Sequence, residues 1–401
     1  MSGYNAIEPG TDLARYAREL MRMHESFIGG GRSAIQPRPL VSRSWQRVLG
    51  FGLVADRTGA RDPLPPARVE QLRGESPLHL VIDDLARVIS SVADASHFLM
   101  VVTNGDGIIL WRRGDSKVRR RADRLGFSEG ARWTEDAVGT NAIGTALEEA
   151  SPVQLFSGEH FEQAQHPWYC TAFPIHDPRS GELLGIVDIS GPALTLHPAI
   201  SALVETAVLL AESLLRRHHE AALERLRLAA EPVVSAGGGP ALVVDDAGWV
   251  AHSAGVATRD RIAVPEADRP LAVPGLGLCM PERLDLGWLV RTAAADRRIT
   301  AHLELGRKPA VEICADAAPW RVALSQRHAQ ILQQLAGAGR EGLTPYELSV
   351  ALFGDGEHVV AARAEVSRLR RSLGAIVDGS PYRIADGVHL TVTPAAESRA
   401  F

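Results

Sequence analysis

The chain has 401 residues, of which 45% are hydrophobic and 23% are charged, and its formal net charge is −5. This length predicts roughly two to four domains, and the mild acidity means that any contact with nucleic acid must come from a local basic patch. We find no apolar window long enough to span a bilayer and no signal segment, and the three cysteines are too scattered for a disulfide framework or a CxxC zinc site. We therefore expect a cytoplasmic protein without a membrane partner.

Residues 1–78 are predicted to be an N-terminal helical segment. Leu13, Tyr16, Leu20 and Met23 recur at helical spacing after the possible caps Thr11 and Asp12. The following stretch, residues 40–53, is expected to dock on the next domain with Trp45 buried.

Residues 79–195 predict a domain with an antiparallel sheet. A helix over 79–95 precedes strands at 98–103 and 108–111, which the Asn-Gly-Asp-Gly turn at 104–107 joins as a hairpin. The apolar run 183–189 is a further, buried strand. The turn Gly139-Thr140-Asn141 leads into another helix.

Four blocks within this domain are distinctive: Trp133–Leu147 (WTEDAVGTNAIGTAL), Glu159-His160-Phe161, residues 170–175 (CTAFPI) and residues 177–185 (DPRSGELLG). In order and spacing they resemble the GAF sensor domain of the acetoin catabolism and glycerol-metabolism regulator family. The resemblance implies a transcriptional regulator that senses a small organic effector, and not an enzyme.

Six residues of these blocks are the predicted ligand site. Trp133 and Phe161 supply apolar walls, Thr140, Asn141 and His160 supply hydrogen bonds, and Cys170 lies beside them. The alternative is that these residues only build an α/β core. Neither a cofactor nor a metal is expected, because the spacing of Glu159, His160, His166 and Cys170 matches no standard zinc pattern.

Residues 196–230 predict one long connecting helix. Its residues Leu203, Ala207, Leu210 and Leu214 approach a coiled-coil seam, which favours a homodimer. A helix lying only on its own domain is the alternative. The Gly/Pro-rich residues 231–240 then open a small β-rich, PAS-like domain, 231–322, with a hairpin over 241–252 and strands at 299–305, 311–315 and 320–324.

Residues 323–395 predict a winged helix-turn-helix. Ser325 caps a first helix, Thr344 and Glu347 form a capping box for a second, and a third runs over 358–373. Strands 382–384 and 388–392 would form the wing. The run 365–374 resembles the recognition helix of response-regulator winged-helix domains.

The third helix suggests double-stranded DNA as the partner. Arginine offers the paired donors that phosphate and guanine accept. The expected DNA-binding residues are Arg363, Ser367, Arg368, Arg370, Arg371 and Arg383. Carboxylates balance the arginines over residues 325–392, so the positive charge is local to this helix.

The best-known members of the resembled family carry an ATPase module. This chain has no G-x-x-x-x-G-K-[ST] loop, so ATP hydrolysis is not expected. The predicted fold class is therefore α+β and multidomain, with a GAF-like sensor, a PAS-like domain and a winged helix-turn-helix. Two alternatives remain open: an RNA-binding antiterminator, and a thiol-based redox sensor or enzyme that uses Cys170.

Overall fold

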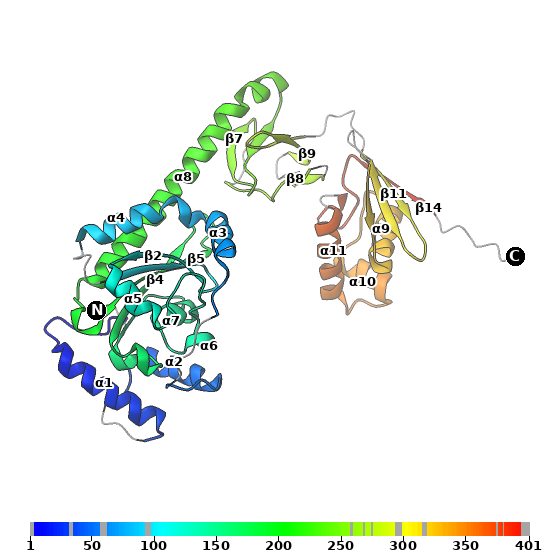
Figure 1. Cartoon of the computed structure of the whole chain (residues 1–401). Helices are drawn as coiled ribbons and strands as arrows, with labels where there is room; N and C mark the ends of the chain where they lie inside the picture. The colour runs from blue at the N-terminus through cyan, green and yellow to red at the C-terminus, as the bar shows by residue number, and fades with distance from the viewer. Residues whose placement is uncertain are drawn as a thin grey trace. The chain divides into compact units, whose positions relative to one another are not determined.

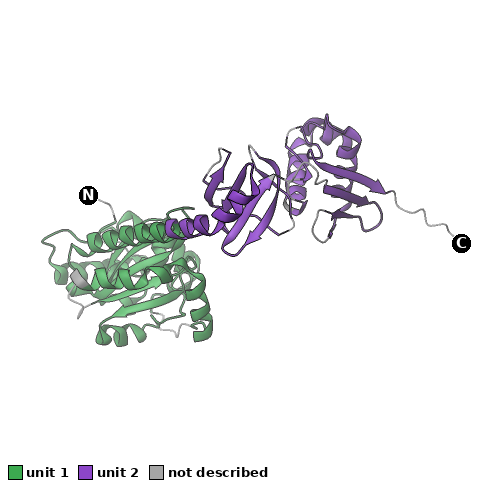
Figure 2. Cartoon of the chain, turned by 90° about the horizontal axis from the view of Figure 1, so that it is seen from above, with its two compact units in different colours: residues 1–219 green, residues 220–401 purple. Residues whose placement is uncertain are grey.

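Among the described residues, the chain forms three β-sheets, one within residues 1–219 and two within residues 220–401 (Figures 1 and 2). The computed structural model describes residues 4–31, 35–56, 62–92, 98–256, 260–267, 269–273, 276–292, 299–314, 319–373, 376–379 and 381–393. Each of the two units has hydrophobic cores of its own. In the described part, no helix combines the length and the apolar character that crossing a membrane requires.

The first sheet is antiparallel, with the strand order β2-β1-β5-β4-β3. Its strands are β1 (Leu99–Thr103), β2 (Ile109–Gly114), β3 (Val153–Phe156), β4 (Trp168–His176) and β5 (Leu183–Pro192). The predicted hairpin and the predicted buried strand are both confirmed, since β1 pairs with β2 on one side and β5 on the other. The α+β class with an antiparallel sensor sheet is therefore confirmed.

Short helices precede, connect and follow these strands. They are α3 (Pro66–Glu75), η1 (Pro77–Leu80), α4 (Ile82–Val92), α5 (Ser116–Asp123), α6 (Glu135–Val138), α7 (Ala142–Glu149), η2 (Ser157–Glu159), η3 (Gln163–Gln165) and η4 (Ala193–Thr195). Helix α7 begins at the predicted turn, because the side chain of Asn141 accepts a hydrogen bond from the N–H of Gly144 at 2.9 Å. The turn needs glycine at position 139, whose φ is +82°.

The N-terminal helices α1 (Leu13–Ile28) and α2 (Pro39–Gly50) share the hydrophobic core of the first sheet. Trp45 is fully buried, as predicted, and its Nε1 donates a hydrogen bond to the carbonyl of Glu159 at 3.1 Å. Helix α1 approaches η2 so closely that a Cβ on Gly158 would lie 2.6 Å from the backbone carbon of Leu20. The segment is thus an integral layer of residues 1–219.

Helix α8 (Ile200–Gly237) is longer than predicted, and residues 231–237 of the expected Gly/Pro-rich linker belong to it. Pro232 lacks the N–H of a helical hydrogen bond, which ordinarily ends a helix. Burial compensates for this loss, because Leu226 and Ala230 pack against Val243 and Leu289. The division between the two units falls within α8, at residue 219.

The second sheet has the order β7-β6-β10-β9-β8. Its strands are β6 (Ala241–Val244), β7 (Val250–Ala254), β8 (Leu271–Val273), β9 (Gly277–Leu284) and β10 (Gly287–Thr292). Counted along the chain, this is the same topology as that of the first sheet, and all its pairs are antiparallel. The predicted hairpin over 241–252 is confirmed.

The third sheet corrects two predictions. Strands β11 (Ile299–Glu304), β12 (Ala310–Cys314) and β13 (Trp320–Ala323) were expected in the middle domain, but β14 (Val388–Thr393) pairs in parallel with β11 and joins them in one sheet. The predicted domain boundary at residue 322 therefore separates β11 and β12 from helices that share their hydrophobic core. The predicted hairpin of 382–384 with 388–392 is wrong, because Tyr382 instead bridges Leu343.

The physical reason lies in packing. Val388, Leu390 and Val392 alternate along β14 and pack on the same core as Ala301 and Leu303 of β11. That apolar contact selects a partner strand almost ninety residues earlier in the chain over the neighbouring segment.

Helices α9 (Gln326–Ala338), α10 (Pro345–Phe353) and α11 (Val359–Leu373) complete this core, as predicted. The capping box is present: the Thr344 hydroxyl accepts from the N–H of Glu347 at 3.2 Å, and the Glu347 carboxylate accepts from the N–H of Thr344 at 2.8 Å. Ala362, Val366 and Leu369 lie on the inner face of α11 and are buried in the core.

Candidate functional site

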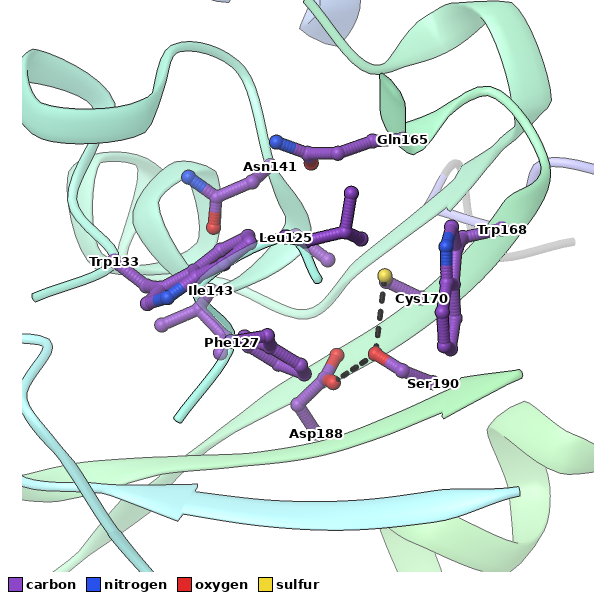
Figure 3. Close-up of a pocket in the computed structure, with 11 residues that line it drawn as sticks. Leu125, Phe127, Trp133, Asn141, Ile143, Gln165, Trp168, Cys170, Asp188 and Ser190 are labelled. Atoms are coloured by element: carbon purple, nitrogen blue, oxygen red, sulfur yellow. Dashed lines mark hydrogen bonds between the residues drawn. The ribbon is translucent and has the colours of Figure 1, made fainter. Parts of the chain in front are cut away.

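A pocket opens between α7 and the paired strands β4 and β5 (Figure 3). It encloses about 310 Å³ of empty space when its mouth is included. The lining residues come from the segment after α5, the start of α7, η3 and the two strands: Leu125, Phe127, Trp133, Asn141, Ala142, Ile143, Gln165, Trp168, Cys170, Asp188 and Ser190.

Strand register explains why four of these side chains face the same space. Cys170 lies opposite Ser190 in the β4–β5 pair. Because alternate residues of a strand point to the same side, Trp168 joins Cys170 on that side and Asp188 joins Ser190. The two strands thereby supply the floor of the pocket.

The floor is a chain of three polar groups. The hydroxyl of Ser190 donates to Oδ2 of Asp188 at 2.5 Å and lies 3.1 Å from Sγ of Cys170. Burial raises the pKa of Asp188 to about 7. Burial and the neighbouring Asp188 also raise the pKa of the Cys170 thiol well above its usual value, so Cys170 is a protonated and weakly reactive thiol.

The walls are apolar and aromatic. Phe127 and Trp133 meet edge to face with ring centroids 4.3 Å apart. The guanidinium of Arg121 lies over the ring of Trp168 at 5.2 Å. Asn141 contributes little free polar surface, because its amide donates to the carbonyl of Gly139 and its oxygen caps α7.

Three of the six predicted ligand residues line this pocket: Trp133, Asn141 and Cys170. The other three lie outside it. Thr140 is buried with its hydroxyl 2.6 Å from that of Ser44, and Phe161 packs against Gly139. His160 is fully buried and its Nδ1 donates to the carbonyl of Ser157 at 3.0 Å. Thr140 thereby contacts α2, and the carbonyl of Phe161 accepts a hydrogen bond from His24 of α1 at 2.8 Å, contacts that the local sequence could not reveal.

The sequence reasoning missed eight lining residues: Leu125, Phe127, Ala142, Ile143, Gln165, Trp168, Asp188 and Ser190. One signal was available for two of them. Asp188 and Ser190 interrupt an otherwise apolar strand at alternate positions, and a buried polar pair on one face of a strand is an indication of a site.

Within the described ranges, no group of three or more His, Cys, Asp or Glu side chains is arranged to hold a metal ion. His166 lies near His24, with ring centroids 4.6 Å apart, and burial lowers the pKa of His166 to about 3.

On α11, the predicted DNA-contacting side chains Arg363, Ser367, Arg368 and Arg370 are exposed along the side opposite the core. Arg368 forms an ion pair with Glu365. Arg383 lies beyond the helix and pairs with Asp378 and Asp386. The side chain of Arg371 lies outside the described part of the structure.

Comparison with known proteins identifies the sensor half. A family model described as the N-terminal domain of MimR matches residues 17–212, which contain the pocket. The chain is also 31% identical to an uncharacterised 47.3 kDa protein from the thcA 5′ region of Rhodococcus erythropolis, over 94% of this chain and 72% of that protein. The chain belongs to the family of this Rhodococcus protein.

Larger regulators also match part of the chain. The activator of the acetoin dehydrogenase operon in Bacillus subtilis is 41% identical over 28% of this chain and 18% of its own length. The activator of the propane 2-monooxygenase operon in Mycolicibacterium goodii is 30% identical over 47% of this chain and 32% of its own length. The chain thus spans well under half of either activator, and the resemblance to the acetoin-regulator sensors is confirmed. Both relatives are named as transcriptional activators and not as enzymes.

Proposed function

We propose that the chain is a small-molecule-responsive transcriptional regulator that binds double-stranded DNA as a homodimer in the cytoplasm. The observation that carries the proposal is a pocket, open at its mouth, within the residues that match the model of the MimR N-terminal domain. The exposed arginines of α11 supply the DNA-binding surface, and the pocket of residues 17–212 supplies the effector site.

Contacts between the pocket strands and α8 provide a route for the signal. Strand β4 carries Cys170 in the pocket floor, and its last residue, His176, donates its N–H to Glu212 of α8 at 2.8 Å. Gln154 of β3 also donates to Ser201 of α8, at 2.9 Å. Effector binding that shifts β4 is therefore transmitted to α8.

The same helix supplies the dimer surface of the proposal. The predicted seam of Leu203, Ala207, Leu210 and Leu214 does not face outward as a whole, because Ala207 is buried in the core of the first unit and Leu214 packs against that core. Leu209 and Leu210 are instead 60% and 42% exposed. Two adjacent exposed leucines on the outer side of a helix suit a second copy of α8.

The test is a titration of the full chain with duplex DNA from its own upstream region at two salt concentrations. Arg363 and Arg370 lie two helical turns apart on one stripe of α11. We expect the double variant Arg363→Ala, Arg370→Ala to weaken binding on the order of 100-fold or more, since a base-contacting arginine is worth about 1–3 kcal/mol. It should also reduce the salt dependence of binding.

A matched control removes two exposed arginines of α5, in the variant Arg119→Ala, Arg120→Ala. It should bind DNA like the wild type. Equal loss in both variants would indicate a nonspecific charge effect. Binding to the transcript RNA in place of the duplex would favour the antiterminator alternative.

The redox alternative predicts a dependence on Cys170. Because its thiol is buried and its pKa is raised, we expect the variant Cys170→Ala to bind DNA like the wild type, both before and after treatment with hydrogen peroxide. A peroxide response in the wild type that the variant lacks would instead make Cys170 a sensor.

A further inference from the structure

The pocket floor contains a buried carboxylate, that of Asp188, with a hydrogen bond to only one of its two oxygens. Oδ2 of Asp188 accepts a hydrogen bond from Ser190, whereas Oδ1 has no hydrogen-bond partner among the described residues. The side chain is fully buried and forms part of the pocket lining (Figure 3). A buried acceptor without a partner costs free energy. A ligand that donates a hydrogen bond to this oxygen would therefore bind favourably.

The other lining residues determine which ligand charge the pocket can accommodate. Lysine, arginine and histidine are absent from the eleven lining residues, and Asp188 is the only carboxylate. The neighbouring thiol of Cys170 is protonated and adds no positive charge. Above about pH 7, where Asp188 is ionised, an anionic molecule would meet a negative group with no cationic side chain among the lining residues, so anions are disfavoured.

The rest of the pocket suits a short apolar body. The lining is mostly apolar: Phe127, Trp133 and Trp168 contribute aromatic rings, and Leu125 and Ile143 contribute aliphatic side chains. Aromatic rings attract both apolar groups and cations. The amide of Asn141 is engaged by the backbone, and the amide nitrogen of Gln165 donates to Glu162 at 2.9 Å. Asp188 is therefore the charged anchor of the lining.

We propose that the effector is a small, non-anionic organic molecule whose hydroxyl or ammonium group donates a hydrogen bond to Oδ1 of Asp188. Its apolar body lies among the rings of Phe127, Trp133 and Trp168. The inference rests on the proposed sensor function of residues 17–212 and assigns Asp188 as the residue that selects the effector.

The test compares molecules that share one carbon skeleton and differ in their polar group. The full chain is titrated with butan-2-ol, sec-butylamine, butanone and 2-methylbutyrate. A second series carries the same polar groups on a six-carbon chain. Ligand-observed NMR and the shift in Tm, both at pH 8 where Asp188 is mostly ionised, report binding. We expect an alcohol or an amine to bind and the corresponding ketone and carboxylate to bind at least 10-fold more weakly.

Two variants make the assignment specific. Asp188→Asn preserves the shape of the side chain but replaces a carboxylate oxygen with an amide, and it should weaken binding of the alcohol or amine by about 10- to 100-fold. Asp106→Asn, in the exposed turn between β1 and β2, is the matched control and should bind like the wild type. Far-ultraviolet circular dichroism verifies that both variants are folded.

Several outcomes would overturn the inference. They are tighter binding of the ketone or the carboxylate, wild-type affinity in Asp188→Asn, or no binding of any alcohol or amine in the series. The DNA titration without effector distinguishes the two proposals: intact DNA binding with any of these outcomes refutes only the assignment of the effector, whereas loss of DNA binding refutes the regulatory function.

Discussion

Replacing Arg47 with alanine should lower the free energy of unfolding of residues 1–219 by about 3–5 kcal/mol. The reason is Glu135, whose side chain is only 1% exposed and which forms an ion pair with Arg47, Nε to Oε2, at 2.8 Å. Without the guanidinium, a buried carboxylate loses its counter-charge but cannot reach water.

The surrounding polar network increases the effect. The hydroxyls of Ser44 and Thr145 both donate to Oε1 of Glu135, at 2.5 and 2.8 Å. Arg47 comes from α2 and Glu135 from α6, so the pair connects the N-terminal segment to the sensor. Losing it should loosen α2 as well as the turn before α7.

Arg43 provides the matched control. It lies one helical turn before Arg47 and pairs with Glu149, but its side chain is 53% exposed. Arg43→Ala should therefore destabilise the first unit far less than Arg47→Ala. Hydrogen exchange of peptides within residues 135–156, measured in the full chain, reports the stability of the first unit alone.

Equal destabilisation by Arg43→Ala and Arg47→Ala would show that the burial of Glu135 is unimportant. A second variant guards against complete unfolding. Glu135→Gln in the Arg47→Ala background should recover part of the lost stability, because a neutral amide needs no counter-charge.

Asp188→Asn should change how the stability of residues 1–219 depends on pH. Burial raises the pKa of Asp188 from its ordinary value of 3.8 to about 7, so the folded protein holds the proton more tightly than the unfolded chain. The stabilisation from this proton is complete below about pH 4 and is lost as the pH rises to about 7, with a total of at most about 4 kcal/mol. Asparagine does not titrate, so the variant should lack this loss.

The difference between variant and wild type isolates Asp188 from the buried histidines. Burial lowers the pKa of His160 to about 4, so its protonation opposes folding as the pH falls. That contribution is common to both proteins and cancels. The difference is measured by urea unfolding at several pH values between 4 and 7, followed by hydrogen exchange of the peptides within residues 135–156. The control variant Asp106→Asn should show the same pH dependence as the wild type. Parallel pH profiles for wild type and Asp188→Asn would contradict a raised pKa.

Part of the pocket was predictable because it depends on local geometry. Asn141 caps α7 through contacts within three residues, and the hairpin of β1 and β2 is closed by its own turn. The predicted site failed where residues close in sequence diverge in space. Asn141 lines the pocket, while the neighbouring Thr140 faces Ser44 of α2, more than ninety residues away.

The sequence by itself determined the elements whose signals lie within a few residues: the caps of α7, α9 and α10, strands β1, β2 and β5 of the first sheet, and the arginine-bearing outer side of α11. Only the tertiary structure decided that α8 continues through Pro232, that β14 pairs with β11, and that Asp188 lies on the pocket floor. Capping and turn formation are set by contacts between near neighbours, which the sequence states directly. Strand partners and buried sites depend on which distant apolar surfaces pack together, and that choice belongs to the folded chain as a whole.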